Sequence, residues 1–365
     1  MNRYNRHIIL SEIGQVGQDK ISNAKVLVIG AGGLGCPVLQ YLTAAGVGTI
    51  GIIDFDVVEL SNLQRQVLYG KSSLGKNKAL AAKERLEDLN DAISIQAYPE
   101  PLTYQNAILL FYQYDIIVDG SDNFETRYLV NDACIITKTP LVFSAIYKFE
   151  GQVSVFNYKD GPSYRCLFPS PPKKDTVPNC SEIGVIGVLP GIIGSMQANE
   201  VLKIILGIGN TLSGKLLCYN ALNNQTSTLK IKRNDMVIQT VLNEKVSFKD
   251  QKTSFNCVNE DQDVSFENIY LEDHIQYVDV REPHEQPKVN NLNTKLIPLS
   301  VLEKNLDQID TSKKTVLFCQ SGMRSKKAVE ILKERNINNC FSLIEGATEI
   351  NNYLKEQHKI LSNDK

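Results

Sequence analysis

The sequence lacks the features that would place it in several large classes of protein. It has no tryptophan, and no apolar segment approaches the length of a membrane span. Residues 1–6 contain no apolar run of the kind that opens a secretion signal. A net charge of −2 gives no excess of positive charge for nucleic acid or an anionic membrane surface. We therefore expect a cytoplasmic protein that binds neither nucleic acid nor membrane.

The eight cysteines are scattered, and no two of them form a CxxC pair. Scattered cysteines in a long chain without a signal segment indicate reduced thiols rather than a framework of disulfides. Most of them suit the role of small buried apolar residues. Two of them, Cys180 and Cys319, are singled out by their surroundings.

The chain of 365 residues is long enough for two domains, and its pattern divides accordingly. Residues 1–232 alternate strand-like and helix-like segments, which predicts an open, mostly parallel α/β sheet with helices on both faces and an antiparallel extension. Residues 233–262 are polar and lack a sustained pattern, which is typical of a linker. A second, smaller α/β pattern is expected over residues 263–365.

A glycine-rich turn in the first pattern indicates a phosphate-binding site. Gly30-Ala31-Gly32-Gly33-Leu34-Gly35 follows an apolar run at 26–29, and helical spacing begins after it. Free N–H groups and the helix dipole make the first turn of such a helix an anion site. Asp54 follows at about the 20-residue interval at which an acid reaches a ribose hydroxyl. The pattern predicts a Rossmann-like nucleotide-binding unit, with a tight glycine turn in a nucleotide-free protein as the alternative.

Charged residues beyond the glycine turn would suit adenylation, in which a carboxylate attacks the α-phosphate of ATP. This reaction needs cations for the pyrophosphate, a bridging metal and an acid held in line. Arg65 and Lys78 are candidate cations, and Asp122, with Asn123 beside it, is a candidate Mg²⁺ ligand at a strand end. Taken singly, these residues are better explained as surface charges and a helix cap. Their joint placement beside a phosphate turn favours a site.

Five segments of the first pattern resemble the MoeB/ThiF family, the adenylyltransferases of sulfur-carrier proteins. They are Arg3-Tyr4-Asn5-Arg6, Gly32-Gly33-Leu34-Gly35-Cys36, Asp54-Phe55-Asp56, Ser61-Asn62-Leu63-Gln64-Arg65-Gln66 and Ser121-Asp122-Asn123. The resemblance implies an ATP site formed by Gly33, Asp54, Ser61, Asn62, Arg65, Lys78, Asp122 and Asn123. It implies a homodimer in which Arg6 reaches the ATP of the other subunit. The implied substrate is the C-terminal Gly-Gly carboxylate of a small ubiquitin-like sulfur carrier of the MoaD/ThiS type.

The chain departs from this family where the family binds zinc. The family holds a structural Zn²⁺ with two CxxC pairs, whereas here Cys166 is followed by Leu167-Phe168-Pro169, and no second pair follows Arg233. Because such a site needs four thiolate or imidazole ligands, we expect no structural zinc. Cys180 resembles the position at which some relatives carry a cysteine that bonds covalently to the activated carrier. A loop cysteine without a role is the alternative.

The second pattern places a cysteine in a turn between a strand and a helix, at Cys319-Gln320-Ser321-Gly322-Met323-Arg324. The N–H groups of such a turn can converge on the sulfur, and Arg324 and the helix N-terminus favour thiolate over thiol. A buried strand-end cysteine is the alternative. This turn and the run 278–285 resemble the single-domain rhodanese fold over about residues 264–358, although Pro287-Lys288-Val289-Asn290-Asn291 replaces the usual His-Ile-Pro-Gly-Ala-like segment.

The two resemblances together imply a two-step enzyme. A carrier carboxylate is adenylated with ATP and Mg²⁺ and then receives sulfur from a rhodanese persulfide, which gives a thiocarboxylate for molybdopterin, thiamine or thiolated-tRNA synthesis. The sulfur donor would be a cysteine desulfurase or thiosulfate. The chemistry would be carried by Asp122, Arg6, Arg65, Cys180 and Cys319.

Two other classes of function stay open. An NAD-dependent oxidoreductase would share the glycines and Asp54, but it leaves Arg65, Lys78 and the Cys319 turn unexplained. A binding scaffold with degenerate sites is opposed by the intact cations and the intact cysteine.

Overall fold

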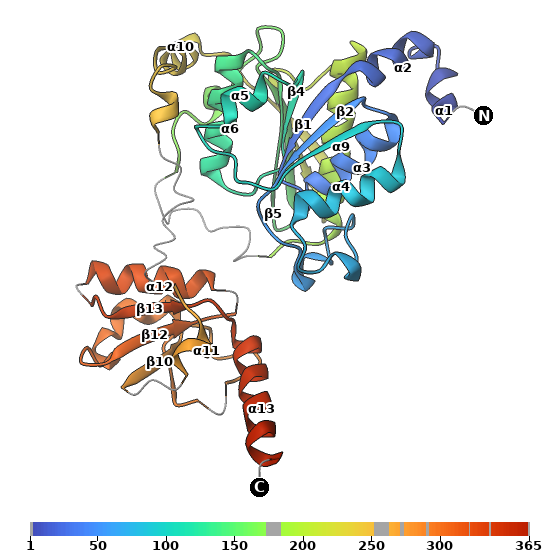
Figure 1. The fold of residues 1–365 in the computed structure, drawn as a ribbon. Coiled ribbons are helices and arrows are strands. Elements are labelled where there is room, and N and C mark those ends of the chain that lie inside the picture. The colour runs from blue at the N-terminus through green and yellow to red at the C-terminus, as the bar shows by residue number, and fades with distance from the viewer. Residues whose placement is uncertain are drawn as a thin grey trace. The chain divides into compact units, whose positions relative to one another are not determined.

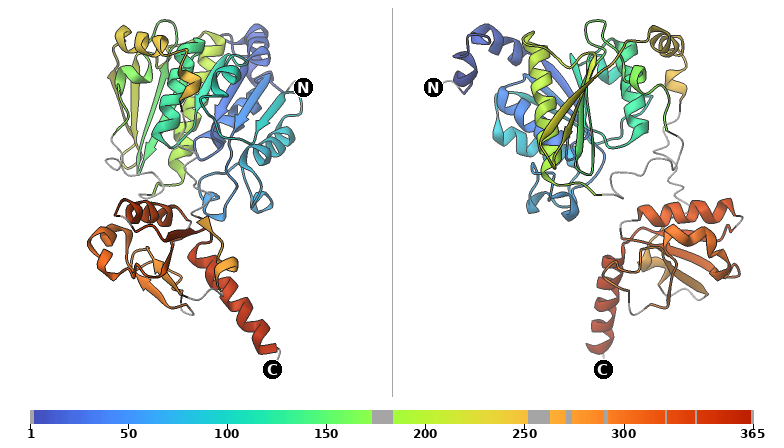
Figure 2. Two further views of the ribbon diagram at one scale, coloured as in Figure 1. Left: turned by 60° about the vertical axis from the view of Figure 1, so that its left-hand side comes forward. Right: turned by 180° about the vertical axis from the view of Figure 1, so that it is seen from behind.

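The computed structural model describes residues 3–172, 184–251, 263–270, 274–289, 292–320, 322–335 and 337–363. The chain forms two compact units, Met1–Ser254 and Phe255–Lys365, each with its own sheet (Figures 1 and 2). Among the described residues, no helix is long and apolar enough to cross a membrane.

The first unit is built on an eight-stranded sheet with the order β3-β2-β1-β4-β5-β6-β7-β8. Its parallel strands are β1 (Lys25–Ile29), β2 (Thr49–Ile53), β3 (Ser94–Tyr98), β4 (Ile116–Asp119) and β5 (Leu141–Tyr147). Three antiparallel strands extend it: β6 (Glu150–Phe156), β7 (Lys215–Asn220) and β8 (Gln225–Lys230). The predicted Rossmann-like sheet with an antiparallel extension is therefore confirmed.

Helices cover both faces of this sheet (Figure 1). One core contains residues of α2 (Gly14–Asn23), α3 (Gly35–Ala45), α4 (Lys78–Leu89) and α9 (Val188–Leu206). The other contains residues of α5 (Ala107–Phe111), α6 (Phe124–Thr137) and α7 (Tyr164–Leu167). Along β1, Val26 and Val28 enter the first core, whereas Leu27 and Ile29 enter the second. A strand that is buried on both faces must be apolar at every position, which explains the continuous apolar run.

A short helix, α10 (Asp235–Asn243), lies within residues 233–262, where composition predicts a linker. Its side chains Ile238 and Val241 are buried in the core with α5, α6 and α7, as is Phe248 in the turn η3 (Phe248–Asp250). Gln105 donates hydrogen bonds to the carbonyls of Lys249, at 2.9 Å, and Gln251, at 3.1 Å. The first unit therefore extends beyond residue 232, and this part of the linker prediction is corrected.

The second unit has a five-stranded sheet with the order β11-β10-β12-β13-β9, and all its pairs are parallel. Its strands are β9 (Asp263–Val264), β10 (Ile275–Asp279), β11 (Thr294–Leu296), β12 (Lys314–Phe318) and β13 (Cys340–Leu343). The helix α12 (Met323–Glu334) and the turn η6 (Leu299–Lys304) pack on one face, and α11 (Phe266–Ile269) and α13 (Ala347–Asn363) pack on the other. The expected smaller α/β fold is present.

Candidate active site

The glycine turn joins the end of β1 to the start of α3 in the middle of the first sheet. Gly30 has a φ of +84°, a left-handed conformation that favours glycine. A Cβ on Gly35 would collide with the carbonyl of Gly30, so only glycine lets the helix start this close to the strand. The chain reverses its strand order between β1 and β4, where open α/β sheets bind their ligands.

Asp54 follows β2 and holds the glycine turn from the side. Its carboxylate accepts hydrogen bonds from the N–H groups of Ala31, at 2.7 Å, and Asp56, at 2.9 Å. Burial raises the pKa of the Asp54 carboxyl, while the charge of Lys78 and the Ala31 N–H act in the opposite direction. The expected ribose-binding acid thus lies directly beside the phosphate turn and fixes its backbone.

The segment 61–66 lies against the same turn. Asn62, in the turn η1 (Leu60–Asn62), accepts a hydrogen bond from the N–H of Glu59 at 3.1 Å, and Ser61 donates to the Glu59 carboxylate at 3.1 Å. Arg65 donates to the Ser61 carbonyl at 3.1 Å. A Cβ placed on Gly33 would lie 3.6 Å from Cγ of Arg65, so the stem of this arginine runs beside the glycine turn.

Lys78 is the first residue of α4, and its side chain is only 9% exposed. Its ammonium lies 2.9 Å from the carboxylate of Asp56, whose side chain is 51% exposed. Asp56 belongs to the motif that carries the family resemblance, but no role for it is predicted from the sequence. Its position two residues after Asp54 was the available signal, since both follow the same strand end.

The loop between β4 and α6 presents Asp122 and Asn123. Asn123 caps α6 by accepting a hydrogen bond from the N–H of Thr126 at 2.9 Å. Asp122 is exposed, and within the described part of the chain its carboxylate has no hydrogen-bond or ion-pair partner. Ser121 is held on both sides, since its N–H donates to Asp119 at 2.9 Å and its carbonyl accepts from Arg127 at 3.5 Å. The exposed carboxylate is therefore carried on a fixed backbone.

This loop adjoins the glycine turn. A Cβ placed on Gly30 would lie 3.0 Å from the carbonyl oxygen of Gly120, directly before Ser121. The structure thus brings together the strand ends that carry Gly33, Asp54 and Asp122, with Arg65 beside the turn. Asp119 and Arg127, which sequence reasoning missed, lie beneath this loop. Burial raises the pKa of the Asp119 carboxyl, and the charge of Arg127 opposes that shift.

Arg6 lies in α1 (Asn5–Ile8), away from the glycine turn of its own chain. The amide of Asn90, just after α4, donates to the hydroxyl of Tyr4 at 2.9 Å. The ring of Tyr4 lies against Gly46, at the end of α3. This segment is therefore fixed at the C-terminal ends of α3 and α4, whereas the glycine turn and Lys78 are at their N-terminal ends. Figures 1 and 2 show α1 and α2 at the edge of the unit.

Cys166 occupies the position at which the family begins its zinc site. Its sulfur accepts hydrogen bonds from the N–H groups of Ser163 and Asn234, both at 3.3 Å. Asn234 in turn caps α10. No group of three or more His, Cys, Asp or Glu side chains that could hold a metal ion occurs in the part of the chain that the structure describes. These residues do not fit a structural zinc site, and Cys166 instead contacts the start of α10.

In the second unit, Cys319 directly follows β12 and is only 1% exposed. Its sulfur lies 3.7 Å from the hydroxyl of Ser325, which also donates to the Gly322 carbonyl at 2.9 Å. Gly322 has a φ of +79° and precedes α12, so the turn reverses sharply onto the helix N-terminus. Cys180 lies outside the described residues.

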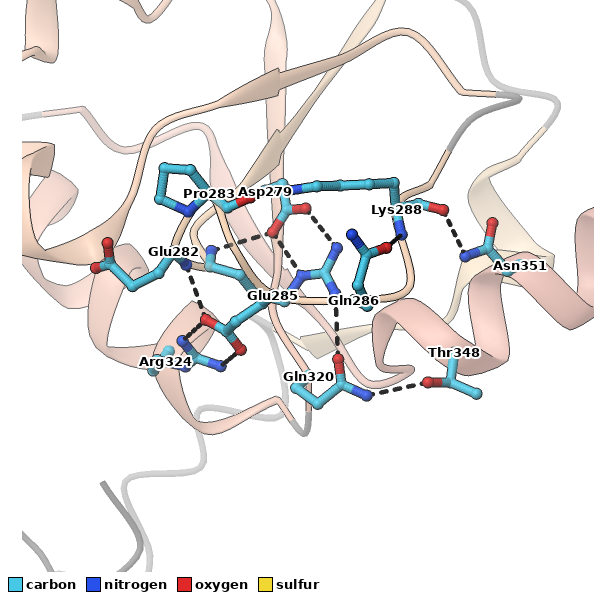
Figure 3. A network of polar contacts seen from close by, with 11 residues as sticks. Asp279, Glu282, Pro283, Glu285, Gln286, Lys288, Gln320, Arg324, Thr348 and Asn351 are labelled. Atoms are coloured by element: carbon cyan, nitrogen blue, oxygen red, sulfur yellow. Dashed lines mark hydrogen bonds and ion pairs between the residues drawn. The ribbon is translucent and has the colours of Figure 1, made fainter. Parts of the chain in front are cut away.

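Two arginines tie the Cys319 turn to the segment after β10 (Figure 3). The guanidinium of Arg281, a residue only 1% exposed, donates to Asp279 at 2.7 and 2.9 Å and to the Gln320 side chain at 3.1 Å. Arg324 donates to both carboxylate oxygens of Glu285, at 2.5 and 2.7 Å. The hydrogen bonds from Arg324 lower the pKa of Glu285 to about 2. From the sequence alone, the run 278–285 is identified only by its resemblance to the rhodanese fold, and these ion pairs are not predicted.

A cavity of about 450 Å³ adjoins this network. It is lined by Gln286, Pro287, Lys288, Thr348, Asn351, Asn352 and Lys355. Thr348 accepts a hydrogen bond from Gln320 at 3.0 Å, and Asn351 donates to the Lys288 carbonyl at 2.9 Å. The segment that departs from the rhodanese pattern therefore forms one wall of a cavity next to the Cys319 turn.

These features define a two-part α/β enzyme, with a nucleotide-type phosphate turn flanked by cations in one unit and a buried thiol in a tight turn in the other. The chain belongs to the ThiF family, whose model matches residues 4–238. This membership confirms the family that the sequence motifs indicated.

Three curated relatives are similar to this chain over most of their own length. A sulfur carrier protein adenylyltransferase of Thermus thermophilus is 52% identical over 239 residues, covering 64% of this chain and 88% of that protein. The adenylyltransferase and sulfurtransferase MOCS3 of Xenopus laevis is 41% identical over 365 residues, covering 91% of this chain and 81% of that protein. The probable adenylyltransferase/sulfurtransferase MoeZ of Mycobacterium tuberculosis is 40% identical over 359 residues, covering 93% and 90%.

Solved structures share the fold of part of the chain. A crystal structure of Escherichia coli MccB with ATP has a TM-score of 0.57 and 26% sequence identity. The likeness covers 64% of this chain and 73% of that chain.

Proposed function

We propose that the protein adenylates the C-terminal Gly-Gly carboxylate of a ubiquitin-like sulfur carrier and then converts it into a thiocarboxylate with sulfur from Cys319. The observation that carries this proposal is the presence of both sites in one chain. Relatives named for both activities match more than 90% of it. The acylating agent made by the first site is what a sulfur nucleophile from the second site requires.

In the first step, a carrier carboxylate oxygen attacks the α-phosphorus of ATP, and pyrophosphate leaves. The N–H groups of the glycine turn and the charges of Arg65 and Lys78 would stabilise the developing negative charge. Asp54 would contact the ribose, and Ser61, Asn62 and Asn123 shape the surrounding loops. The products are the carrier acyl-adenylate and pyrophosphate.

Asp122 fits the role of a Mg²⁺ ligand because its carboxylate is exposed, unpartnered among the described residues and held on a fixed loop. Mg²⁺ is commonly bound by one or two protein carboxylates, with phosphate oxygens and waters as the other ligands. The bound ion would neutralise charge on the phosphates. Asp122 would hold the ion on the loop that adjoins the glycine turn.

We infer a homodimer from the position of Arg6. This exposed residue lies at the ends of α3 and α4 opposite to its own phosphate turn, so it cannot serve the site of its own chain without moving the α1 segment. A second copy of the chain would bring Arg6 to a site across the interface.

In the second step, a persulfide on Cys319 attacks the acyl carbon, and AMP leaves. A second thiolate then attacks the Cys319 sulfur and breaks the S–S bond, which releases the carrier thiocarboxylate and leaves a disulfide. Two external thiols reduce this disulfide and leave as a disulfide of their own. Cys180 is a candidate for the second thiolate or for an acyl link. The need for reduced thiols fits a cytoplasmic location.

Mass spectrometry of candidate carriers after incubation with ATP and a persulfide donor tests this function. A thiocarboxylate must form with the intact protein and not without ATP. The family membership supports adenylation rather than NAD-dependent oxidoreduction. Absence of both ATP–pyrophosphate exchange and sulfur transfer would instead support a scaffold with degenerate sites.

A further inference from the structure

The cation of the Cys319 turn, Arg324, is already neutralised by a carboxylate from another segment. Arg324 and Glu285 form a two-pronged ion pair with N–O distances of 2.5 and 2.7 Å (Figure 3). Their side chains are 29% and 23% exposed, so water screens the pair only in part. Such paired N–H···O bonds between a guanidinium and a carboxylate are strong and geometrically specific. An anion that approaches Cys319 must compete with Glu285 for this guanidinium.

Two further cations beside the turn, Arg281 and Lys288, also have partners within the chain. Arg281 is buried against Asp279, with N–O distances of 2.7 and 2.9 Å. The ammonium of Lys288 donates to the Pro283 carbonyl at 2.5 Å. The two guanidinium charges are therefore balanced by the two carboxylates of Asp279 and Glu285, and the walls that these four residues form carry no net charge.

We propose that Glu285 determines which sulfur donor this site uses. By pairing with Arg324, Glu285 keeps the guanidinium from binding dianionic donors such as thiosulfate, so that Cys319 takes its sulfur from persulfides. This inference rests on the proposed function of Cys319 as the sulfur carrier. Thiosulfate brings two negative charges and leaves as sulfite, also a dianion, so it needs a free cation in the turn. A persulfide carries one negative charge at its reacting end and leaves as a thiolate, which solvent can protonate.

The two reactions differ only in the leaving group. With a persulfide, the Cys319 thiolate attacks the terminal sulfur, the new Cys319 S–S bond forms, the donor S–S bond breaks, and its electron pair leaves on the donor thiolate. With thiosulfate, the same attack on the outer sulfur breaks the S–S bond and expels sulfite. Neither reaction needs an oxidant or a reductant. The selectivity therefore depends on the charge that the turn presents to the leaving group.

The test compares thiosulfate and cysteine persulfide as donors to the full-length protein, with cyanide as the sulfur acceptor. In the unmodified protein, kcat/KM for thiosulfate should be at least about tenfold below that for cysteine persulfide. Glu285→Gln should raise the ratio of thiosulfate to persulfide kcat/KM by about tenfold or more, mainly through a lower KM for thiosulfate. This substitution keeps the shape of the side chain and frees the Arg324 charge.

Glu282→Gln is the matched control. Glu282 lies in the same segment and accepts a hydrogen bond from Ser300 at 2.8 Å, but its carboxylate does not contact Arg324. This variant removes one negative charge from the same loop and should leave the donor ratio unchanged. An equal shift in both variants would mean that general charge, and not the Glu285–Arg324 pair, sets the preference.

Two outcomes overturn the inference while the proposed function stands. One is an unchanged donor ratio in a folded Glu285→Gln protein, and the other is an unmodified protein that uses thiosulfate as well as persulfide. The second outcome needs no variant and so remains decisive if Glu285→Gln does not fold. Sulfur transfer from neither donor would overturn the proposed sulfur transfer and this inference together.

Discussion

Lys78 and Asp56 form an ion pair of 2.9 Å between the first turn of α4 and the segment that follows β2. The pair fixes the ammonium beside Asp54 and the glycine turn, in a site where Lys78 is largely buried. A buried ammonium needs such a partner, since an unpaired charge there would be costly. The orientation of the lysine side chain is therefore set by the Asp56 carboxylate.

Lys78→Met should reduce ATP–pyrophosphate exchange by about a hundred- to a thousandfold, because one well-placed electrostatic group typically contributes that much to the rate. Lys76→Met is the matched control. Lys76 forms an exposed surface pair with Glu84 at 2.8 Å, and its loss should change the exchange rate less than about twofold. Exchange that survives in Lys78→Met would remove this residue from the site.

Arg6→Ala and Asp122→Ala should each be inactive alone but partly active when mixed. If Arg6 serves the partner's site, a mixed dimer contains one site with neither substitution. Subunit exchange followed by ATP–pyrophosphate exchange measures this, and up to about a quarter of normal activity is expected, because half of the dimers are mixed and each has one intact site. Light scattering that shows an active monomer would contradict the arrangement.

The protein should contain no structural zinc. Cys166 contacts the N–H groups of Ser163 and Asn234 at 3.3 Å, and the positions that would supply further thiolates hold other residues. Metal analysis of protein purified without a metal-binding tag should give much less than one zinc per chain. A zinc content near one, with unfolding on addition of a chelator, would show that other ligands exist.

Cys319→Ala should leave ATP–pyrophosphate exchange intact and abolish thiocarboxylate formation from a persulfide donor. The reason is that the phosphate turn belongs to the first unit, whereas Cys319 belongs to the second. Cys218→Ser is the control, because this thiol lies in β7 of the first unit. A normal yield of thiocarboxylate from the Cys319→Ala protein, with no free sulfide present, would contradict the sulfur-transfer half of the function.

The Glu285–Arg324 pair should make the stability of the second unit depend on pH in the acid range. The folded-state pKa of Glu285 is lowered to about 2, against about 4.3 for an unperturbed glutamate. A lowered pKa stabilises the fold above the unfolded value and loses this contribution as the pH falls toward the folded value. The contribution is on the order of 2 kcal/mol after allowance for solvent screening.

The measurement is thermal unfolding of the full chain and of Glu285→Gln between about pH 5 and pH 2. The difference in Tm between the two proteins should be largest near pH 5 and should shrink as the pH falls. A difference that stays constant over this range would mean that Glu285 acts through its shape and not through its charge.

Much of the fold could be predicted from the sequence because the patterns that indicate its strands and its glycine turn are local. The apolar runs at β1 and β4 are buried on both faces, and Gly30 and Gly35 are required by backbone geometry. Helix α10 was missed although a local signal exists, since Asn234 caps it and Ile238 and Val241 recur at helical spacing. The helix is short and is flanked by polar residues, so the apolar residues that it packs on α6 were not recognised.

The pairing of charged side chains within the two sites could not be predicted from the sequence for a related reason. Arg281 looks like a surface residue in the sequence, yet it is buried because Asp279 and Gln320 satisfy its guanidinium. The Asp56–Lys78 and Glu285–Arg324 pairs join residues that are 22 and 39 positions apart. Such pairs depend on how strand ends meet in space, which cannot be inferred from a local sequence pattern.

The two hydrogen bonds of Asp54 also bear on affinity. Because its carboxylate holds the N–H of Ala31 at 2.7 Å, the glycine turn takes its shape during folding, through contacts within the chain. A ligand that enters a loop which is already ordered does not lose binding free energy to the entropy of ordering that loop. Under the proposed function, loss of the Asp54 carboxylate weakens the binding of phosphate as well as of ribose, since a disordered turn must be ordered anew at each binding event.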